Sequence, residues 1–291
     1  MLRVDAALRA MGHDVVLLPD GIDEKSLMIE IRDADLLLMC YTPVPASIIE
    51  AAKRRGIPVV NVPEYAEETV AEGAFALLLA LVKKLKPIHG AMQTAGWAWP
   101  EAKWMGVDLA GKTLGIVGMG KIGSSMARMA GAFRMRVLGF DREQKNLKKF
   151  LAECDFVSIH CVLNEETRNL IGAAELAAMK PTAFLVNVSR GAIVDELALL
   201  RALQDKRIAG AALDVYSLEP LAKTGHPLSA LYAMDNVILF PHLTFYTQEA
   251  MQRLEDETLE RALEVPEGRP VLVKSRDPRL HSQMTGVRFQ D

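Results

Sequence analysis

The sequence predicts an α/β protein with a doubly wound parallel sheet, and three observations support this prediction. The middle of the chain alternates between short apolar runs and amphipathic helical patterns. The apolar runs have no polar face, which is typical of strands covered on both sides of a parallel sheet. Most of the runs are separated by a helical pattern, the order expected of βαβ units. The pattern extends over residues 88–245.

Six strands and four intervening helices are expected in this stretch. The strands are predicted at residues 112–118, 136–141, 155–160, 183–189, 208–215 and 236–240. The helices are predicted where apolar residues recur at helical spacing, at residues 122–133, 147–154, 173–179 and 195–204.

The two ends of the chain are predicted to form a second, smaller α/β domain. Residues 1–87 contain three apolar segments that we interpret as strands, at 14–19, 34–40 and 57–62, with helices between them. Residues 246–291 contain one helix, at about 248–263, and an irregular tail. We therefore expect one domain of residues 1–87 and 246–291, with a domain of residues 88–245 inserted into it. A length of 291 residues fits two domains.

Composition and charge argue against several classes of protein. The net charge of −3 provides no basic surface for a nucleic acid or a membrane. The N-terminus has no apolar signal core, and the longest apolar run, residues 74–82, is shorter than the ~20 residues that span a bilayer. Cys40, Cys154 and Cys161 have no metal-binding spacing. We expect a reduced, cytoplasmic protein without metal, nucleic-acid or membrane partners.

A glycine-rich turn follows the first strand of the larger domain. In GIVGMGKIG, residues 115–123, Gly118 permits a sharp turn, Gly120 lets the backbone approach a pyrophosphate, and Gly123 lets helix and strand pack closely. The helix that starts at Lys121 and Ile122 presents its N–H groups to the phosphates. The turn predicts a dinucleotide site; the alternative is a packing turn without a ligand.

An acidic residue at the end of the next strand predicts which dinucleotide binds. Asp141 stands 18 residues after Gly123, where a carboxylate accepts hydrogen bonds from a ribose diol. The same carboxylate repels a 2′-phosphate, so NAD is expected rather than NADP. The neighbouring Arg142 leaves residual NADP use open.

Polar side chains follow three other strands of the predicted sheet. Arg190 follows FLVNVS, Asp214 ends AGAALD, Glu219 comes shortly after it, and His242 follows VILFP. Ligands of such sheets bind outside the carboxyl ends of the strands, so we expect these side chains to converge. His160, at another strand end, is a rival candidate without a clear carboxylate partner.

Hydride transfer to a carbonyl group needs three functions that these residues provide. A cation with a planar fork polarises the carbonyl and holds a carboxylate, which suits Arg190. An acid supplies the proton, which suits His242 near pH 7. A carboxylate orients that histidine, which suits Glu219. Taken singly, each residue also fits a structural role: a surface ion pair, a loop histidine and a turn residue.

These segments resemble the D-isomer-specific 2-hydroxyacid dehydrogenases. The matching motifs are GKTLGIVGMGKIG, FVSIH, LVNVSRGAIVDELAL, GAALDVYSLEP and DNVILFPH, and the resemblance covers most of residues 52–264. It implies a Rossmann NAD domain inserted into a flavodoxin-like domain, a small 2-oxo or D-2-hydroxy acid as substrate, and a homodimer formed through residues 94–109. It places the catalytic set on Arg190, Glu219 and His242, and adds Ser189 and Asp214 to the cofactor site.

The chain also departs from the family pattern. No strand precedes VDAALRAMG, and a helical pattern runs through Ile49 and Glu50, where the family has a strand and a loop for the substrate carboxylate. After Asp141, residues 142–154 form a minimal crossover. Thr244 and Phe245 stand where the family has small residues. Internal segments missing from the sequence and a true deletion are both open explanations.

The predicted function is the NAD-linked interconversion of a small 2-oxo acid and its D-2-hydroxy acid. The alternative is a non-catalytic NAD-binding redox sensor or scaffold, which the missing carboxylate loop favours and the complete catalytic set disfavours. If the Phe245 ring turns inward, we expect very short substrates such as glyoxylate or hydroxypyruvate. If it turns outward, we expect it to pack under the helix near Gln248.

Overall fold

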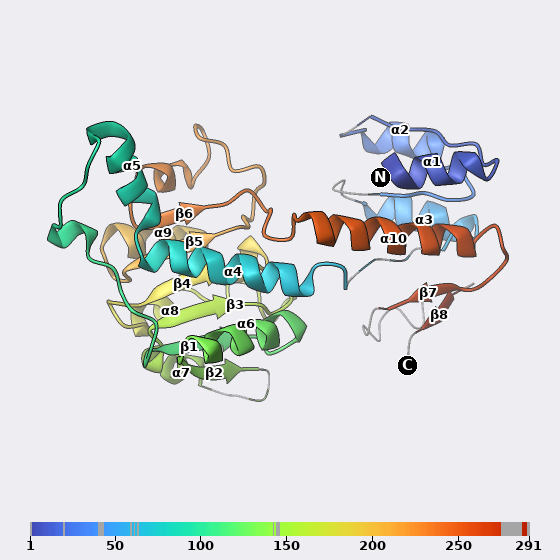
Figure 1. Ribbon diagram of the computed structural model, residues 1–291. Helices are drawn as coiled ribbons and strands as arrows, with labels where there is room; N and C mark the ends of the chain where they lie inside the picture. Colours follow the sequence, from blue (N-terminus) through green and yellow to red (C-terminus); the bar gives the residue numbers. More distant parts are fainter. Residues whose placement is uncertain are drawn as a thin grey trace. The chain divides into compact units, whose positions relative to one another are not determined.

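The computed structural model describes residues 2–19, 21–39, 44–58, 60, 62, 64–141, 143, 146–274 and 287–289. The chain divides into two compact units, Glu67–Tyr246 and Met1–Ala66 with Thr247–Asp291 (Figure 1). The first boundary lies before helix α4 (Glu67–Val82), whereas the sequence placed it at 87/88. Helix α4 joins the larger unit because it packs on α6 (Lys121–Ala132) and on strands of the sheet.

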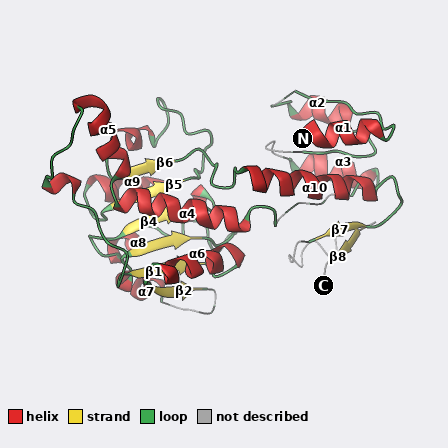
Figure 2. Ribbon diagram, viewed as in Figure 1, coloured by secondary structure: helices red, strands yellow, loops and turns green. Residues whose placement is uncertain are grey.

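The larger unit is built on a six-stranded parallel sheet of order β2–β1–β3–β4–β5–β6 (Figure 2). All six strands predicted for residues 88–245 are confirmed. Most of their residues are buried, as expected for a sheet covered on both faces. The strands are β1 (Thr113–Val117), β2 (Arg136–Phe140), β3 (Phe156–Ile159), β4 (Phe184–Asn187), β5 (Gly210–Leu213) and β6 (Val237–Leu239).

Helices cover both faces of this sheet. Helices α4 and α6 pack with Leu114, Ile116 and Phe156 in one apolar cluster. On the opposite face, the alternate strand residues Val157 and Ile159 pack with α7, α8 and α9. The predicted helices of this domain are confirmed, with α7 at Leu147–Glu153, α8 at Ala173–Ala178 and α9 at Glu196–Gln204. Short 3-10 turns lie at η2 (Gly191–Ile193) and η3 (Ser229–Ala233).

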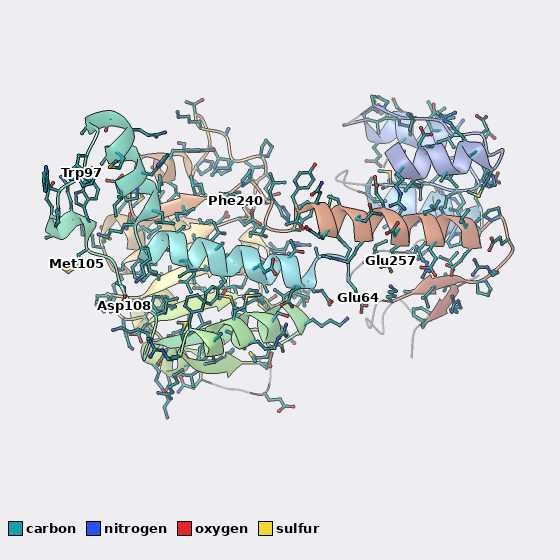
Figure 3. All side chains as sticks on the ribbon, in the orientation of Figure 1. Glu64, Trp97, Met105, Asp108, Phe240 and Glu257 are labelled. Carbon is teal, nitrogen blue, oxygen red and sulfur yellow. The ribbon has the colours of Figure 1, made fainter. Side chains whose placement is uncertain are left out.

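A helical arm projects from the larger unit after α4. It consists of α5 (Leu85–Ala95), which has no buried residue, and the 3-10 turn η1 (Ala102–Trp104). Trp97 and Met105 lie on this arm, away from the sheet (Figure 3).

The smaller unit is mainly helical in its described part. It contains α1 (Leu2–Ala10), α2 (Glu24–Glu30), α3 (Ala46–Arg54), the predicted helix α10 (Gln248–Glu264) and a parallel pair, β7 (Val271–Val273) with β8 (Val287–Phe289). Helix α3 runs without interruption through Ile49 and Glu50, so the family's extra loop would fall inside a continuous helix. None of the described helices is long and apolar enough to cross a membrane.

The first two strands predicted for this unit do not form in the described residues. Residues 14–19 and 34–39 have no strand pairing, Cys40 lies outside the described residues, and the third segment, 57–62, is described only in part. Leu36 and Leu38 pack toward one apolar cluster, whereas Leu37 and Met39 pack toward another. This alternation resembles a strand in the sequence, but it does not by itself provide a hydrogen-bonding neighbour.

Candidate active site

The glycine-rich turn occupies the end of β1 and the start of α6. Gly118 has a φ of +95°, and a Cβ there would lie 2.5 Å from the backbone nitrogen of Cys161. A Cβ at Gly123 would lie 2.2 Å from the carbonyl oxygen of Gly118. Both glycines are therefore required by the fold. A Cβ at Gly120 would meet no atom within 4 Å, so the fold leaves open space where a ligand can approach the backbone.

Asp141 lies beside this turn, at the end of β2. Its Oδ1 accepts the N–H of Met119 at 3.2 Å, and the residue is exposed. The neighbouring Arg142 lies outside the described residues. Lys121 and Ile122 form the first turn of α6, where Lys121 Nζ pairs with Glu67 Oε1 at 3.3 Å. An open glycine turn, a helix N-terminus and an exposed carboxylate fit a dinucleotide better than they fit a packing turn.

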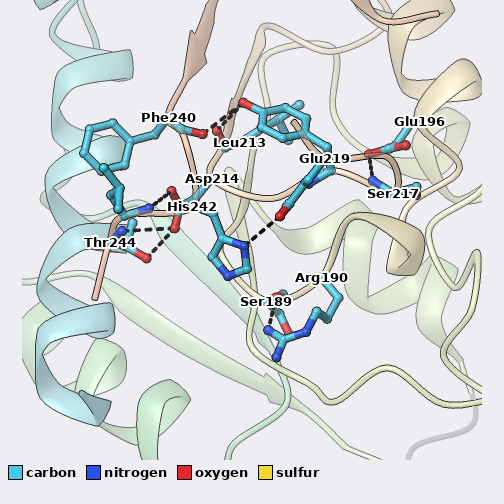
Figure 4. Close-up of polar contacts among 12 residues, drawn as sticks. Ser189, Arg190, Glu196, Leu213, Asp214, Ser217, Glu219, Phe240, His242 and Thr244 are labelled. Atoms are coloured by element: carbon cyan, nitrogen blue, oxygen red, sulfur yellow. Dashed lines mark hydrogen bonds and ion pairs between the residues drawn. The ribbon is translucent and has the colours of Figure 1, made fainter. Parts of the chain in front are cut away.

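His242 and Glu219 form a hydrogen-bonded pair between the segments that follow β6 and β5. Nδ1 of His242 lies 3.0 Å from Oε2 of Glu219 (Figure 4). Oε1 of Glu219 accepts the N–H of Tyr216 at 2.9 Å. The side chains of His242 and Glu219 keep 42% and 37% of their exposure, so solutes can reach them. The structure thus brings together the two residues that were expected to interact.

Arg190 lies in the turn after β4, which a buried asparagine holds. Asn187 Nδ2 donates to the carbonyl oxygen of Arg190 at 3.0 Å, and Asn187 Oδ1 accepts the N–H of Ser189 at 3.1 Å. The guanidinium of Arg190 is exposed, and its Nη1 donates to the carbonyl oxygen of Ser189 at 2.7 Å. Asn187 was not predicted as a site residue, although a polar residue that ends a buried strand is a signal for one.

Gly191 brings the Arg190 turn against the segment that leads to Glu219. A Cβ at Gly191 would lie 2.1 Å from the carbonyl carbon of Tyr216, so only glycine fits this contact. Glu196 reinforces the contact, because its Oε1 accepts the N–H of Ser217 at 2.9 Å (Figure 4). The turn after β4 and the segment after β5 are thus packed together.

Asp214 is fully buried beneath the segment that follows His242. Its carboxylate accepts hydrogen bonds from Leu243 N at 2.8 Å, Thr244 N at 3.1 Å and Thr244 Oγ1 at 2.5 Å. All three donors belong to the two residues that follow His242. The Asp214 carboxylate is thus tied to the segment that carries His242.

His160 contacts Ser158 rather than the His242–Glu219 pair, and it is suited to a structural role. Its Nε2 lies 2.8 Å from Ser158 Oγ, and its Nδ1 is buried without a hydrogen-bond partner. Burial lowers the pKa of His160 to about 4, because desolvation disfavours the charged imidazolium. A histidine that stays neutral near pH 7 is a poor proton donor there.

The Phe245 ring lies against the imidazole of His242. The ring centroids are 6.4 Å apart and the planes are nearly perpendicular, at 88°. Phe245 is 9% exposed, whereas the neighbouring Tyr246 is 59% exposed. Of the two orientations considered for Phe245, this contact favours the inward one.

The site therefore combines the features of a dinucleotide-dependent dehydrogenase, and comparisons with known proteins specify the family. The sequence model described as "D-isomer specific 2-hydroxyacid dehydrogenase, NAD binding domain" matches residues 75–244. A glyoxylate reductase of Korarchaeum cryptofilum is 37% identical over 281 residues, covering 84% of this chain and 83% of that protein. A glycerate dehydrogenase of Methylorubrum extorquens is 34% identical over 270 residues, covering 90% and 85%.

A solved structure shows the same relationship. D-lactate dehydrogenase from Aquifex aeolicus, complexed with NAD and lactic acid, superimposes with a TM-score of 0.78 at 27% identity, covering 92% of this chain and 93% of that one. The chain belongs to the D-isomer specific 2-hydroxyacid dehydrogenase family. It is an NAD-linked oxidoreductase that acts on the CH–OH group of 2-hydroxy acids and on the matching 2-oxo acids. The comparisons give no support to the alternative of a non-catalytic sensor or scaffold.

Proposed function

We propose that this chain reduces a very short 2-oxo acid, of the size of glyoxylate or hydroxypyruvate, to its D-2-hydroxy acid with NADH. The observation that carries the proposal is the His242–Glu219 pair with the Phe245 ring against the imidazole. The names of two relatives, a glyoxylate reductase and a glycerate dehydrogenase, agree with a short substrate.

The roles of the chain's own residues follow from the geometry. Glu219 accepts the hydrogen bond from Nδ1 of His242, so Nε2 is the atom that delivers the proton to the substrate oxygen. Glu219 also stabilises the imidazolium before that proton leaves. Arg190 holds the substrate carboxylate and polarises the carbonyl group. In the opposite direction, His242 accepts the proton of the hydroxyl group.

NAD supplies or accepts the hydride when bound, and the larger unit provides the residues that hold it. Its pyrophosphate would lie on the glycine turn, and its ribose diol on Asp141. We propose that the smaller unit, residues 1–66 and 247–291, provides the substrate domain, which the sequence predicted at 1–87 and 246–291. The proposed cofactor-binding set is Gly118, Gly120, Lys121, Ile122, Gly123, Asp141, Ser189, Arg190, Asp214 and His242.

We also propose a homodimer formed through residues 94–109. Trp97, Trp99 and Met105 are 59%, 73% and 73% exposed on the projecting arm. Neighbouring apolar side chains exposed in this way are typical of protein–protein interfaces. Light scattering of the wild type and of a Trp97→Ser/Trp99→Ser variant tests the dimer, which a monomeric wild type would contradict.

We further propose a cytoplasmic protein, because Cys154 and Cys161 are free thiols.

A panel of 2-oxo acids assayed with NADH tests the proposed substrate. Glyoxylate and hydroxypyruvate should give the highest kcat/KM, and acids with longer side chains should give lower values. A protein that binds NADH but prefers a long-chain 2-oxo acid would overturn the proposal.

A further inference from the structure

The backbone of His242 has an uncommon conformation that its surroundings must maintain. Its φ is +58°, in the left-handed region that few residues with a side chain adopt. Such a conformation persists when the neighbouring structure holds the chain on both sides of it.

Residues at and after the end of β5 hold both sides of this turn. Before His242, the N–H of Phe240 donates to the carbonyl oxygen of Leu213 at 2.8 Å, and the Tyr216 hydroxyl lies 3.1 Å from the carbonyl oxygen of Phe240. After His242, Asp214 accepts the N–H groups of Leu243 and Thr244. The turn is therefore fixed at both ends by a segment that is itself buried in the sheet.

Thr244 adds a side-chain contact to this arrangement. Its hydroxyl donates to Oδ2 of Asp214 at 2.5 Å, the shortest of the three hydrogen bonds to that carboxylate (Figure 4). A hydrogen bond to a buried charged group is stronger than one between neutral groups. Because Asp214 is completely buried, removing this donor takes one of three hydrogen bonds from a charge that solvent does not reach.

Helix α4 fixes the other side of Thr244. Thr244 is 6% exposed, and a Cβ at Gly73 would lie 2.7 Å from Thr244 Cβ and 2.9 Å from Thr244 Cγ2. Gly73 thus provides the space that the threonine side chain occupies. Asp214 and α4 together leave Thr244 little room to move.

We propose that Thr244 is a positioning residue for the reaction, because its hydroxyl on Asp214 and its fit against Gly73 fix the turn that presents His242 to Glu219. This inference rests on the proposed role of His242 as the proton donor. A displacement of about 1 Å at a reacting group is enough to slow a reaction by about 100-fold. The glycine turn and Asp141 lie on other elements, so the NADH dissociation constant should change less than kcat, although Asp214 and His242 also belong to the proposed cofactor set.

Two substitutions at Thr244 test the hydroxyl. Thr244→Val keeps the shape and removes the donor, so kcat with glyoxylate should fall by about 10- to 100-fold, with a much smaller change in the NADH dissociation constant. Thr244→Ser keeps the donor and should retain kcat within about threefold. A Thr244→Val variant with wild-type kcat, or equal losses in both variants, would overturn the proposal.

A substitution on α4 tests the fit without touching the hydroxyl. Gly73→Ala should lower kcat by about tenfold or more, even though alanine favours a helix over glycine. Gly131→Ala in α6 is the matched control, because a Cβ there meets no atom within 4 Å. An unaffected Gly73→Ala enzyme, or equal losses in the two alanine variants, would contradict the proposal. If Thr244→Val does not fold, the comparison of Gly73→Ala with Gly131→Ala tests the proposal by itself.

The role of His242 is tested separately with His242→Gln. If that variant keeps wild-type kcat, the proposed proton donor is wrong. If His242→Gln is inactive and the Thr244 and Gly73 variants are fully active, only the positioning role fails.

Discussion

Nδ1 of His242 lies 3.0 Å from Oε2 of Glu219, and the second oxygen of that carboxylate accepts the backbone N–H of Tyr216. Both oxygens of Glu219 are thus used, one to hold the carboxylate and one to hold the imidazole. A histidine oriented in this way keeps one ring nitrogen for the substrate.

Arg190→Lys should reduce kcat/KM for glyoxylate by about 100-fold, although the positive charge is kept. Lysine lacks the planar fork that holds a carboxylate through two hydrogen bonds. Steady-state kinetics measure the effect, with Arg201→Lys on the exposed face of α9 as the control. A near-normal kcat/KM in the Arg190 variant would remove this residue from the substrate site.

Asp141→Ala should raise the NAD dissociation constant by about tenfold, since hydrogen bonds to a charged acceptor are lost. It should also narrow the preference for NAD over NADP, because the charge that repels a 2′-phosphate is gone. Fluorescence titrations with both cofactors measure these changes. Asp235→Ala, an exposed aspartate before β6, is the control. If affinity and preference both stay unchanged, the ribose assignment is wrong.

Phe245→Ala should raise the kcat/KM of longer 2-oxo acids relative to glyoxylate, because removing a ring beside His242 enlarges the space next to the substrate oxygen. Glyoxylate itself should change little. Competition assays with paired substrates measure the ranking, and Tyr246→Ala is the control on an exposed neighbour. An unaltered ranking together with a lower Tm would show that the ring only supports packing.

His160 should make the folded protein sensitive to mild acid. Its pKa is about 4 in the folded protein against an ordinary value of 6.5, so the unfolded chain binds more protons between these limits. The contribution of the neutral His160 to the free energy of unfolding is fully present above pH 6.5 and is lost as the pH falls toward 4. His160→Gln removes this titrating group. The loss in the free energy of unfolding on acidification should therefore be smaller in the variant by about 1–3 kcal/mol.

Urea unfolding at pH 7 and at pH 4.5 measures the change in the free energy of unfolding for each protein. His89→Gln, an exposed histidine on α5, should keep the wild-type dependence. If the free energy of unfolding changes equally between pH 7 and pH 4.5 in the wild type and in His160→Gln, His160 is not buried in its neutral form.

The sequence predicted the larger unit well, for reasons that are local. Its six strands consist of apolar runs without a polar face, and that pattern has few other interpretations at this length. The glycine turn, Arg190 and His242 come soon after strands, and Glu219 lies in the segment that follows β5, so their place at one edge of the sheet follows from the direction of the strands.

The contacts that hold the site were harder to predict because they join residues far apart in the sequence. Glu196 accepts the backbone N–H of Ser217, 21 residues away, and Thr244 acts through Asp214, 30 residues away. Neither of them belongs to a motif that specifies its partner. The strands expected at 14–19 and 34–40 fail for a related reason: an extended apolar segment does not reveal whether a neighbouring strand is available.

Glu219→Gln should lower kcat by less than the loss of His242, because glutamine still accepts a hydrogen bond through its amide oxygen. We expect a fall of about 10- to 100-fold, from the lost stabilisation of the imidazolium. The ratio of kcat in the two variants is the readout. Equal losses, or a larger loss in Glu219→Gln, would mean that Glu219 does more than orient His242.

The most direct test of the account is kcat of His242→Gln with glyoxylate and NADH, measured beside the NADH dissociation constant of the same preparation. If His242 donates the proton, kcat should fall by about 100- to 10,000-fold, and the NADH dissociation constant should change far less, because the glycine turn and Asp141 still hold the cofactor. A variant that binds NADH normally and reduces glyoxylate at the wild-type rate would contradict the account.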